Sequence, residues 1–139
     1  MVVFVLDTSA LLRFADKESG TARIAEIFAA KEAGTAEILM SAVHWGEVVH
    51  IILKRYGSDN AEESLSKFRA LPIEIIPVTE QRAERTAAIR HKYKIPYADA
   101  FGVELAGDSP DHRLVTADFD VKPASQDIAI DFLPAKLKT

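Results

Sequence analysis

The sequence contains no cysteine, no long apolar run and no excess of basic residues. The absence of cysteine excludes a disulfide framework and any thiolate metal site. The apolar run near the N-terminus, residues 2–6, is too short for a membrane span or a signal-peptide core, and an acid, Asp7, follows it. We therefore expect a protein that has no membrane segment and works in the cytoplasm.

Acidic residues slightly outnumber basic ones. The 21 acidic and 17 basic residues leave a formal charge of −4, which taken alone argues against tight non-specific binding of nucleic acid. Acids that converge on a bound cation count as negative in this sum, although the cation neutralises them. With 139 residues, of which 48% are hydrophobic and 27% charged, the composition predicts one globular domain over residues 1–139.

Short apolar runs alternate with helical patterns along the chain. Strands are predicted at residues 2–6, 36–40, 73–78 and 113–116, with a fifth candidate at 128–133. The run 73–78 is expected at a sheet edge, because prolines flank it and Glu74 interrupts it. Repeated strand–helix alternation predicts a three-layer α/β/α sandwich around a central parallel sheet of four to five strands.

Residues with capping side chains mark where the helices begin. A short helix is predicted over residues 10–15, and later helices are expected to begin near Thr21, Ser41 and Thr79. Asp59 with Glu62 is close to a capping box and predicts one more helix start. A final helix is expected from Tyr97 onward.

Four acids recur where these elements begin or end. They are Asp7 after the first strand, Glu47 in the helix after the second, Asp99 in the first turn of an apolar helix, and Asp118 after the fourth strand. Each alone has an ordinary explanation as a cap, a helix-dipole partner or a solvated residue. Parallel strands end at one edge of the sheet, so the four acids together would repel one another unless cations held them. Oxygen ligands without cysteine or paired histidines suit Mg²⁺ or Mn²⁺.

Three hydroxyl side chains lie close to these acids in the sequence. Thr8, Ser9 and Thr116 are candidate hydrogen-bond donors to the acids or to a bound water, and they are equally candidate cap residues. Carboxylates gathered around such cations support hydrolysis of phosphodiester bonds, with water rather than a side chain as the nucleophile.

The segments that carry the acids resemble the motifs of a known family. They are residues 6–12 (LDTSALL), 41–47 (SAVHWGE), 98–100 (ADA) and 114–120 (LVTADFD). Their order and spacing resemble the PIN domain and, within that superfamily, the VapC-like ribonuclease toxins of type II toxin–antitoxin modules. The resemblance extends from residue 2 to about residue 133.

The resemblance implies a fold, an activity and partners. The activity is that of a Mg²⁺- or Mn²⁺-dependent endoribonuclease, with catalytic and metal-binding roles for Asp7, Glu47, Asp99 and Asp118 and a further metal ligand at Asp120. The partners are an RNA substrate, a second copy of the chain in a homodimer, and a small antitoxin protein that covers the active groove. One position departs from the family pattern, because Val121 stands where an aromatic residue commonly follows the last acid, and Phe119 precedes that acid instead.

Basic residues crowd the helix after the third predicted strand. Arg82, Arg85, Arg90, Lys92 and Lys94 lie on it or at its end, and Arg13, Lys17, Lys54 and Arg55 lie near earlier helices. Contacts to RNA phosphates would need such groups around an acidic site. The alternative is a solvated helix face, on which Glu80 and Glu84 pair with Arg82 or Arg85. No histidine is assigned a catalytic role, and Trp45, Phe68 and Phe101 are expected in the core or in a dimer interface.

Three alternatives to a toxin remain open at this point. A housekeeping nuclease in RNA processing would keep the fold and the chemistry. A receiver-like signalling module is also a doubly wound sheet with acids around Mg²⁺, but the segment Ile75 to Val78 offers no acid to accept a phosphoryl group. A non-catalytic scaffold would have no need of the four acids.

Overall fold

A computed structural model describes residues 1–136 of the chain. These residues form a sheet of five strands, β1 (Val2–Leu6), β2 (Ala36–Ser41), β3 (Glu74–Ile76), β4 (His112–Thr116) and β5 (Ile130–Phe132). All neighbouring strands are parallel, and their order across the sheet is β3-β2-β1-β4-β5. The predicted parallel sheet is therefore confirmed, with the fifth strand present.

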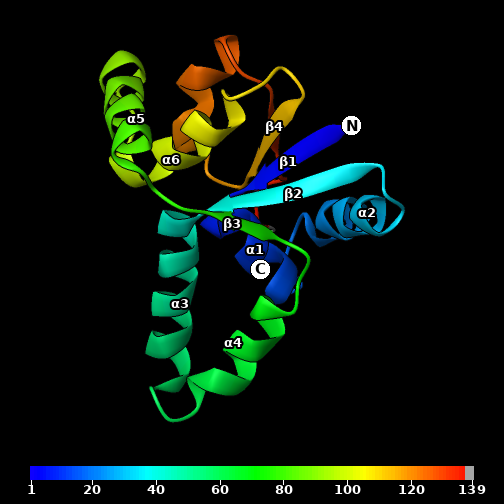
Figure 1. The fold of residues 1–139 in the computed structure, drawn as a ribbon. Coiled ribbons are helices and arrows are strands. Elements are labelled where there is room, and N and C mark those ends of the chain that lie inside the picture. The colour runs from blue at the N-terminus through cyan, green and yellow to red at the C-terminus, as the bar shows by residue number, and fades with distance from the viewer. Residues whose placement is uncertain (137–139) are drawn as a thin grey trace.

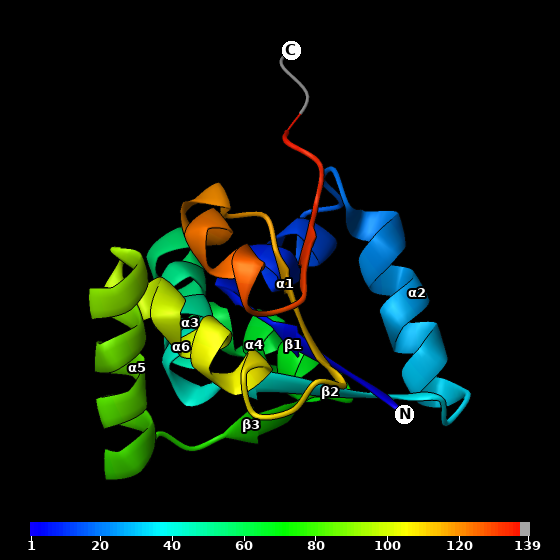
Figure 2. The same ribbon diagram turned by 90° about the horizontal axis from the view of Figure 1, so that it is seen from above.

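Helices cover both faces of the sheet. They are α1 (Thr8–Ala15), α2 (Thr21–Glu32), α3 (Ala42–Tyr56), α4 (Ala61–Arg69), α5 (Glu80–Tyr93), α6 (Tyr97–Ala106) and the 3₁₀ helix η1 (Phe119–Gln126). Figure 1 shows α5 and α6 on one side of the sheet and α1, α2 and α4 on the other. In the view from above, α2 and α5 lie at opposite sides of the molecule (Figure 2). This arrangement confirms the three-layer α/β/α sandwich.

The alternation of side chains along β1 explains the two hydrophobic layers. Phe4 and Leu6 pack into a cluster with residues of α1, α2, α3 and α4, whereas Val5 between them packs with residues of α6 and η1. A strand buried on both faces needs apolar residues at consecutive positions, which is why the run is continuous. Phe101 is buried, and Trp45 and Phe68 are partly buried against the first cluster, as expected for core residues.

The strand order places a topological switch point at the centre of the sheet. After β3 the chain crosses from one side of β1 to the other, so β1 pairs with β2 on one side and with β4 on the other. Open α/β sheets bind ligands in the crevice beyond the carboxyl ends of the strands at such a point. Asp7 follows β1 there, and Asp118 follows β4.

Several predicted boundaries are confirmed. Ser41 caps α3, because its hydroxyl accepts a hydrogen bond from the amide of Val43. Thr79 caps α5, because its hydroxyl accepts a hydrogen bond from the amide of Arg82. The third strand lies at the sheet edge as predicted, although it is shorter than residues 73–78.

Other helix starts differ from the predictions. The N-cap of α4 is Asn60 rather than Asp59, and it makes no side-chain capping bond, so the capping box with Glu62 is absent. Thr21 is the first residue of α2, and its hydroxyl donates to the carbonyl of Arg13 rather than capping its own helix. The N-cap position itself is occupied by Gly20, which has no side chain to accept a capping bond.

The 3₁₀ helix η1 was not predicted from the sequence. It spans Phe119–Gln126 and contains Pro123. A proline in the middle of a segment argues against an α-helix, because it has no amide hydrogen to donate, and the segment lacks a strong apolar period. Its start is capped by Asp118, whose side chain accepts from the amide of Asp120.

No helix among residues 1–136 combines the length and apolar character needed to cross a membrane. The expectation of a single domain over residues 1–139 stays a prediction.

Gly102 lies where α6 approaches both α3 and the sheet. A Cβ atom at this position would stand 3.0 Å from Leu114 Cδ1 and 3.2 Å from the buried ring of His44. We expect Gly102→Ala to lower the free energy of unfolding by about 1–2 kcal/mol, because overpacking outweighs the gain in helix propensity. Urea unfolding measures this change.

Gly46 in α3 provides the matched control. Nothing lies within 4 Å of a Cβ built there. We expect Gly46→Ala to raise the free energy of unfolding by about 0.5–1 kcal/mol, since only helix propensity changes. Equal effects of the two substitutions would contradict the close approach at Gly102.

Candidate active site

Asp7 is fixed at the end of β1 by three donors. It is buried, and its Oδ1 atom accepts hydrogen bonds from the amide of Ala10 at 2.9 Å and from the hydroxyl of Ser9 at 2.7 Å. Its Oδ2 atom accepts from the hydroxyl of Thr116. The carboxylate therefore serves as the N-cap of α1 and is also oriented by a residue of β4.

The hydroxyls of Ser9 and Thr116 join the ends of the two central strands. Thr116 Oγ1 accepts from the amide of Asp118 at 2.9 Å, and Ser9 Oγ accepts from the amide of Ala117 at 2.9 Å. Each hydroxyl thus donates to Asp7 and accepts from the segment after β4. This network holds Asp118 in a defined position relative to Asp7.

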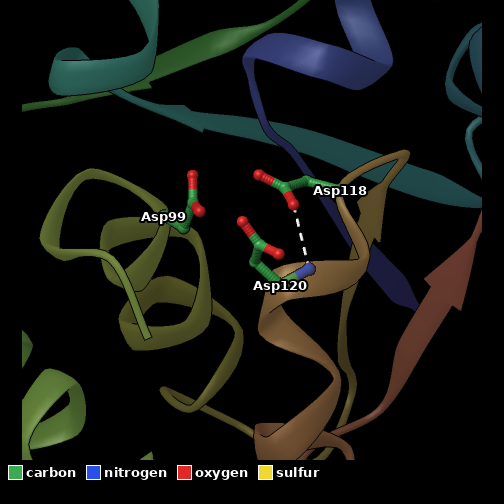
Figure 3. A group of neighbouring side chains, drawn as sticks. All are labelled: Asp99, Asp118 and Asp120. Carbon is green, nitrogen blue, oxygen red and sulfur yellow. Dashed lines mark hydrogen bonds between the residues drawn. The ribbon is translucent and has the colours of Figure 1, made fainter. Parts of the chain in front are cut away.

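Three of the predicted acids form one close group. Asp99, in the first turn of α6, faces Asp118 and Asp120 at the start of η1, as Figure 3 shows. One carboxylate oxygen from each of the three lies within 4.8 Å of the others. The amide of Asp120 donates to Asp118 Oδ1 at 2.9 Å, which fixes the direction of that side chain.

Glu47 lies outside this close group. Its Oε1 atom accepts a hydrogen bond of 2.7 Å from Thr8 Oγ1, and the side chain is 43% exposed. Thr8 follows Asp7 directly, so the contact ties α3 to the end of β1. The structure thus places the three predicted hydroxyls against acids, but it gathers only Asp99, Asp118 and Asp120 at ligand-sharing distance.

The family model that matches this sequence is that of the PIN domain, over residues 4–124. The chain belongs to the PIN domain family. The match includes Asp7, Glu47, Asp99, Asp118 and Asp120. The family expected from the motifs is therefore confirmed. No curated protein sequence matches the chain.

Among the solved structures with the same fold are VapBC complexes and a VapC toxin. VapBC2 from Rickettsia felis, bound to a promoter DNA fragment, aligns with a TM-score of 0.72 and 14% identity, covering 96% of this chain and 100% of that one. DNA-bound VapBC from Salmonella typhimurium aligns with a TM-score of 0.70 and 19% identity, over 95% and 98% of the two chains. VapC20 from Mycobacterium tuberculosis, a sarcin-ricin loop cleaving toxin, aligns with a TM-score of 0.64 and 15% identity, over 94% and 99%. At these identities the likeness shows the fold.

The PIN domain accommodates the unusual order of residues after Asp118. Val121, which stands at the position where the family commonly has an aromatic residue, is buried in the cluster beneath α6. Phe119 is exposed and stacks on Phe132 of β5, with ring centroids 5.2 Å apart. An apolar residue therefore lies inside at position 121, and the aromatic ring of Phe119 lies at the surface.

Burial and the neighbouring carboxylates raise the pKa of Asp99. Partial burial of this carboxyl, together with the negative charges of Asp118 and Asp7, raises its pKa from the ordinary 3.8 to about 7. Burial penalises the ionised form, and neighbouring carboxylates repel a further negative charge. The negative charges of the acidic group are therefore only partly offset by nearby hydrogen-bond donors.

His44 holds α3 and α6 together behind the acids. Its ring is buried, and Nε2 lies 2.9 Å from the carbonyl oxygen of Ala98, the residue before Asp99. Because that oxygen only accepts, Nε2 carries the hydrogen of this bond. Nδ1 has no hydrogen-bond partner in the part of the chain that the structure describes. No role was predicted for His44, and the one signal in the sequence was its place three residues before Glu47.

Arg82 and Arg85 pair with α6 instead of their own helix. Both contact the buried Glu104, at 2.8 and 3.0 Å, and Arg82 also contacts Asp108 at 2.9 Å. The predicted pairs with Glu80 and Glu84 are absent among residues 1–136. A buried carboxylate left unpaired is strongly destabilising, so Glu104 takes both cations.

We expect Asp99→Asn to stabilise the metal-free protein at pH 8. The raised pKa means that folded Asp99 binds a proton that the unfolded chain has already lost, so stability due to this group falls as the pH rises from about 4 to about 7. The variant should gain about 1–2 kcal/mol at pH 8, and the gain should shrink towards pH 4.

Urea unfolding in EDTA at both pH values measures this difference, with Asp111→Asn as the control because Asp111 is exposed and outside the group. A less stable Asp99→Asn protein at pH 8 would contradict the repulsion described here.

Substitutions of His44 test the link between α3 and α6. His44→Leu should lower the free energy of unfolding by about 1–3 kcal/mol, because it removes a donor to the Ala98 carbonyl. His44→Gln keeps an N–H donor and should lose less. Urea unfolding of both variants measures the difference, and equal losses would indicate that ring packing, not the hydrogen bond, dominates.

Proposed function

We propose that this PIN domain is a divalent-metal-dependent endoribonuclease and the toxin of a toxin–antitoxin pair. Membership of the PIN domain family supports a nuclease. The observation that carries the finer proposal is the group of three carboxylates beyond the carboxyl ends of β1 and β4, with Asp7 fixed at its base. We also propose that residues 1–139 form one domain.

The residues present fit a hard divalent cation. The donor atoms are all carboxylate oxygens, which are the ligands that Mg²⁺ and Mn²⁺ prefer. Asp99, Asp118 and Asp120 would bind the metal directly, and Asp7 and Glu47 would complete the site from the end of β1 and from α3. A divalent cation in such a site supplies an activated water and stabilises charge on the phosphate.

The chain's own residues orient the site. Ser9 and Thr116 fix the carboxylate of Asp7, Thr8 fixes Glu47, and the amide of Asp120 fixes Asp118. Carboxylates that are held in place before a ligand binds need little reorganisation when the phosphate arrives. Water is the nucleophile in this proposal, and no side chain forms a bond to phosphorus.

The toxin role is supported by the structural neighbours. VapBC2 from Rickettsia felis and a toxin–antitoxin complex from Klebsiella pneumoniae, the latter 25% identical with a TM-score of 0.59 over 87% of this chain and 90% of that one, belong to such systems. We propose by analogy a small antitoxin partner that covers the acidic group, a homodimer, and a cytoplasmic location.

Cleavage of a mixed RNA pool by the purified protein tests the activity. We expect cleavage with Mg²⁺ or Mn²⁺, none in EDTA, and a loss of about 100-fold or more in Asp99→Asn, because that change removes a metal-binding carboxylate. Asp111→Asn should cleave like the wild type.

A folded wild-type protein, freed of any co-purifying partner, that leaves RNA intact with either metal would overturn the proposal and favour a scaffold. Growth arrest on expression of the chain alone, relieved by a small neighbouring reading frame, would separate a toxin from a housekeeping nuclease.

A further inference from the structure

The basic residues at the end of α5 differ from those at its beginning. Arg82 and Arg85 form salt bridges with Glu104, and Lys92 forms one with Asp127 at 3.4 Å. Arg90 and Lys94 are exposed and form no salt bridge with any carboxylate of residues 1–136. The structure therefore leaves two cations of this helix available to a ligand.

These two cations line one groove. Arg90, His91 and Lys94 surround an open groove of about 630 Å³, together with Ala87, Ile95 and Pro96. Lys94 ends α5 in the left-handed conformation, with φ 57° and ψ 41°, and the next residue, Ile95, is buried. The groove is therefore formed by the C-terminal part of α5 and the turn that leads to α6, and the buried side chain of Ile95 anchors that turn.

The groove lies at the start of the helix that carries Asp99. Pro96 is the N-cap of α6, and Asp99 follows in the first turn, about 4.5 Å further along the helix axis. α5 packs along α6, and α6 packs against η1, which begins after Asp118 (Figure 2). A strand of nucleic acid that reached the acidic group would meet the groove beside it.

We infer that the groove formed by Arg90, His91 and Lys94 binds a phosphate of the RNA strand next to the bond that is cut. The inference rests on the proposed nuclease function and specifies how the substrate is held. A protein with a formal charge of −4 and a dense acidic group repels a polyanion, so binding needs uncompensated cations close to the site. A guanidinium binds phosphate oxygens in pairs, and an ammonium adds a point charge.

The double substitution Arg90→Gln/Lys94→Gln tests the inference, and Arg113→Gln/Lys67→Gln provides a matched control. Arg113 near the N-terminal end of β4 and Lys67 on α4 are also exposed, and each double variant loses one arginine and one lysine. RNA binding is measured by fluorescence anisotropy on the Asp99→Asn background, and cleavage is measured in chains that keep Asp99. Calorimetric titration with Mn²⁺ checks that the metal site is unchanged.

We expect the groove variant to bind RNA about 10-fold more weakly. The negative slope of log K against log salt should become less steep by about 1.4, because two phosphate-binding charges are lost. KM should rise by a similar factor while kcat changes less than about two-fold. The control variant should stay within about two-fold of the wild type in both measurements.

Two results would overturn the inference. Equal losses in both double variants would indicate a diffuse charge effect, and unchanged RNA affinity in the groove variant would remove the groove from substrate binding. In each of these results the wild-type protein still cleaves RNA. Failure of the proposed function would differ, because the wild-type protein itself would then not cleave RNA.

Discussion

The contact between Thr116 and Asp7 is the interaction on which the rest of the site depends. It links the ends of β4 and β1, the two strands that flank the switch point of the sheet. The same hydroxyl accepts a hydrogen bond from the amide of Asp118. One side chain therefore positions both Asp7 after β1 and Asp118 after β4. Carboxylates at one edge repel one another, and fixed hydroxyl and amide donors offset part of that repulsion before any cation binds.

Helix α6 is the second element that the site requires. It carries Asp99 in its first turn, and its position is set from several sides. His44 of α3 contacts the carbonyl of Ala98, and the absence of a side chain at Gly102 allows that approach. At the other end, the buried Glu104 binds Arg82 and Arg85 of α5. The pairing that holds α6 in place also decides which cations of α5 remain available.

Local signals in the sequence predicted much of the fold. The continuous apolar run of β1 and the caps at Ser41 and Thr79 depend on residues close in the chain, and the structure confirms them. Helix α2 does begin at Thr21, but the capping roles predicted for Thr21 and Asp59 are wrong, because Gly20 and Asn60 occupy the N-cap positions. The 3₁₀ helix was missed because Pro123 interrupts the pattern that identifies a helix.

The sequence by itself determined the order of strands and helices and the acids that follow them, because hydrophobic period and capping act over a few residues. Only the tertiary structure decided that Asp99, Asp118 and Asp120 form the close group while Glu47 stands apart with Thr8. It also decided that Arg82 and Arg85 pair with Glu104, whereas Arg90 and Lys94 pair with no carboxylate of residues 1–136. These outcomes depend on contacts between residues far apart in the chain, which helix packing sets and local patterns do not encode.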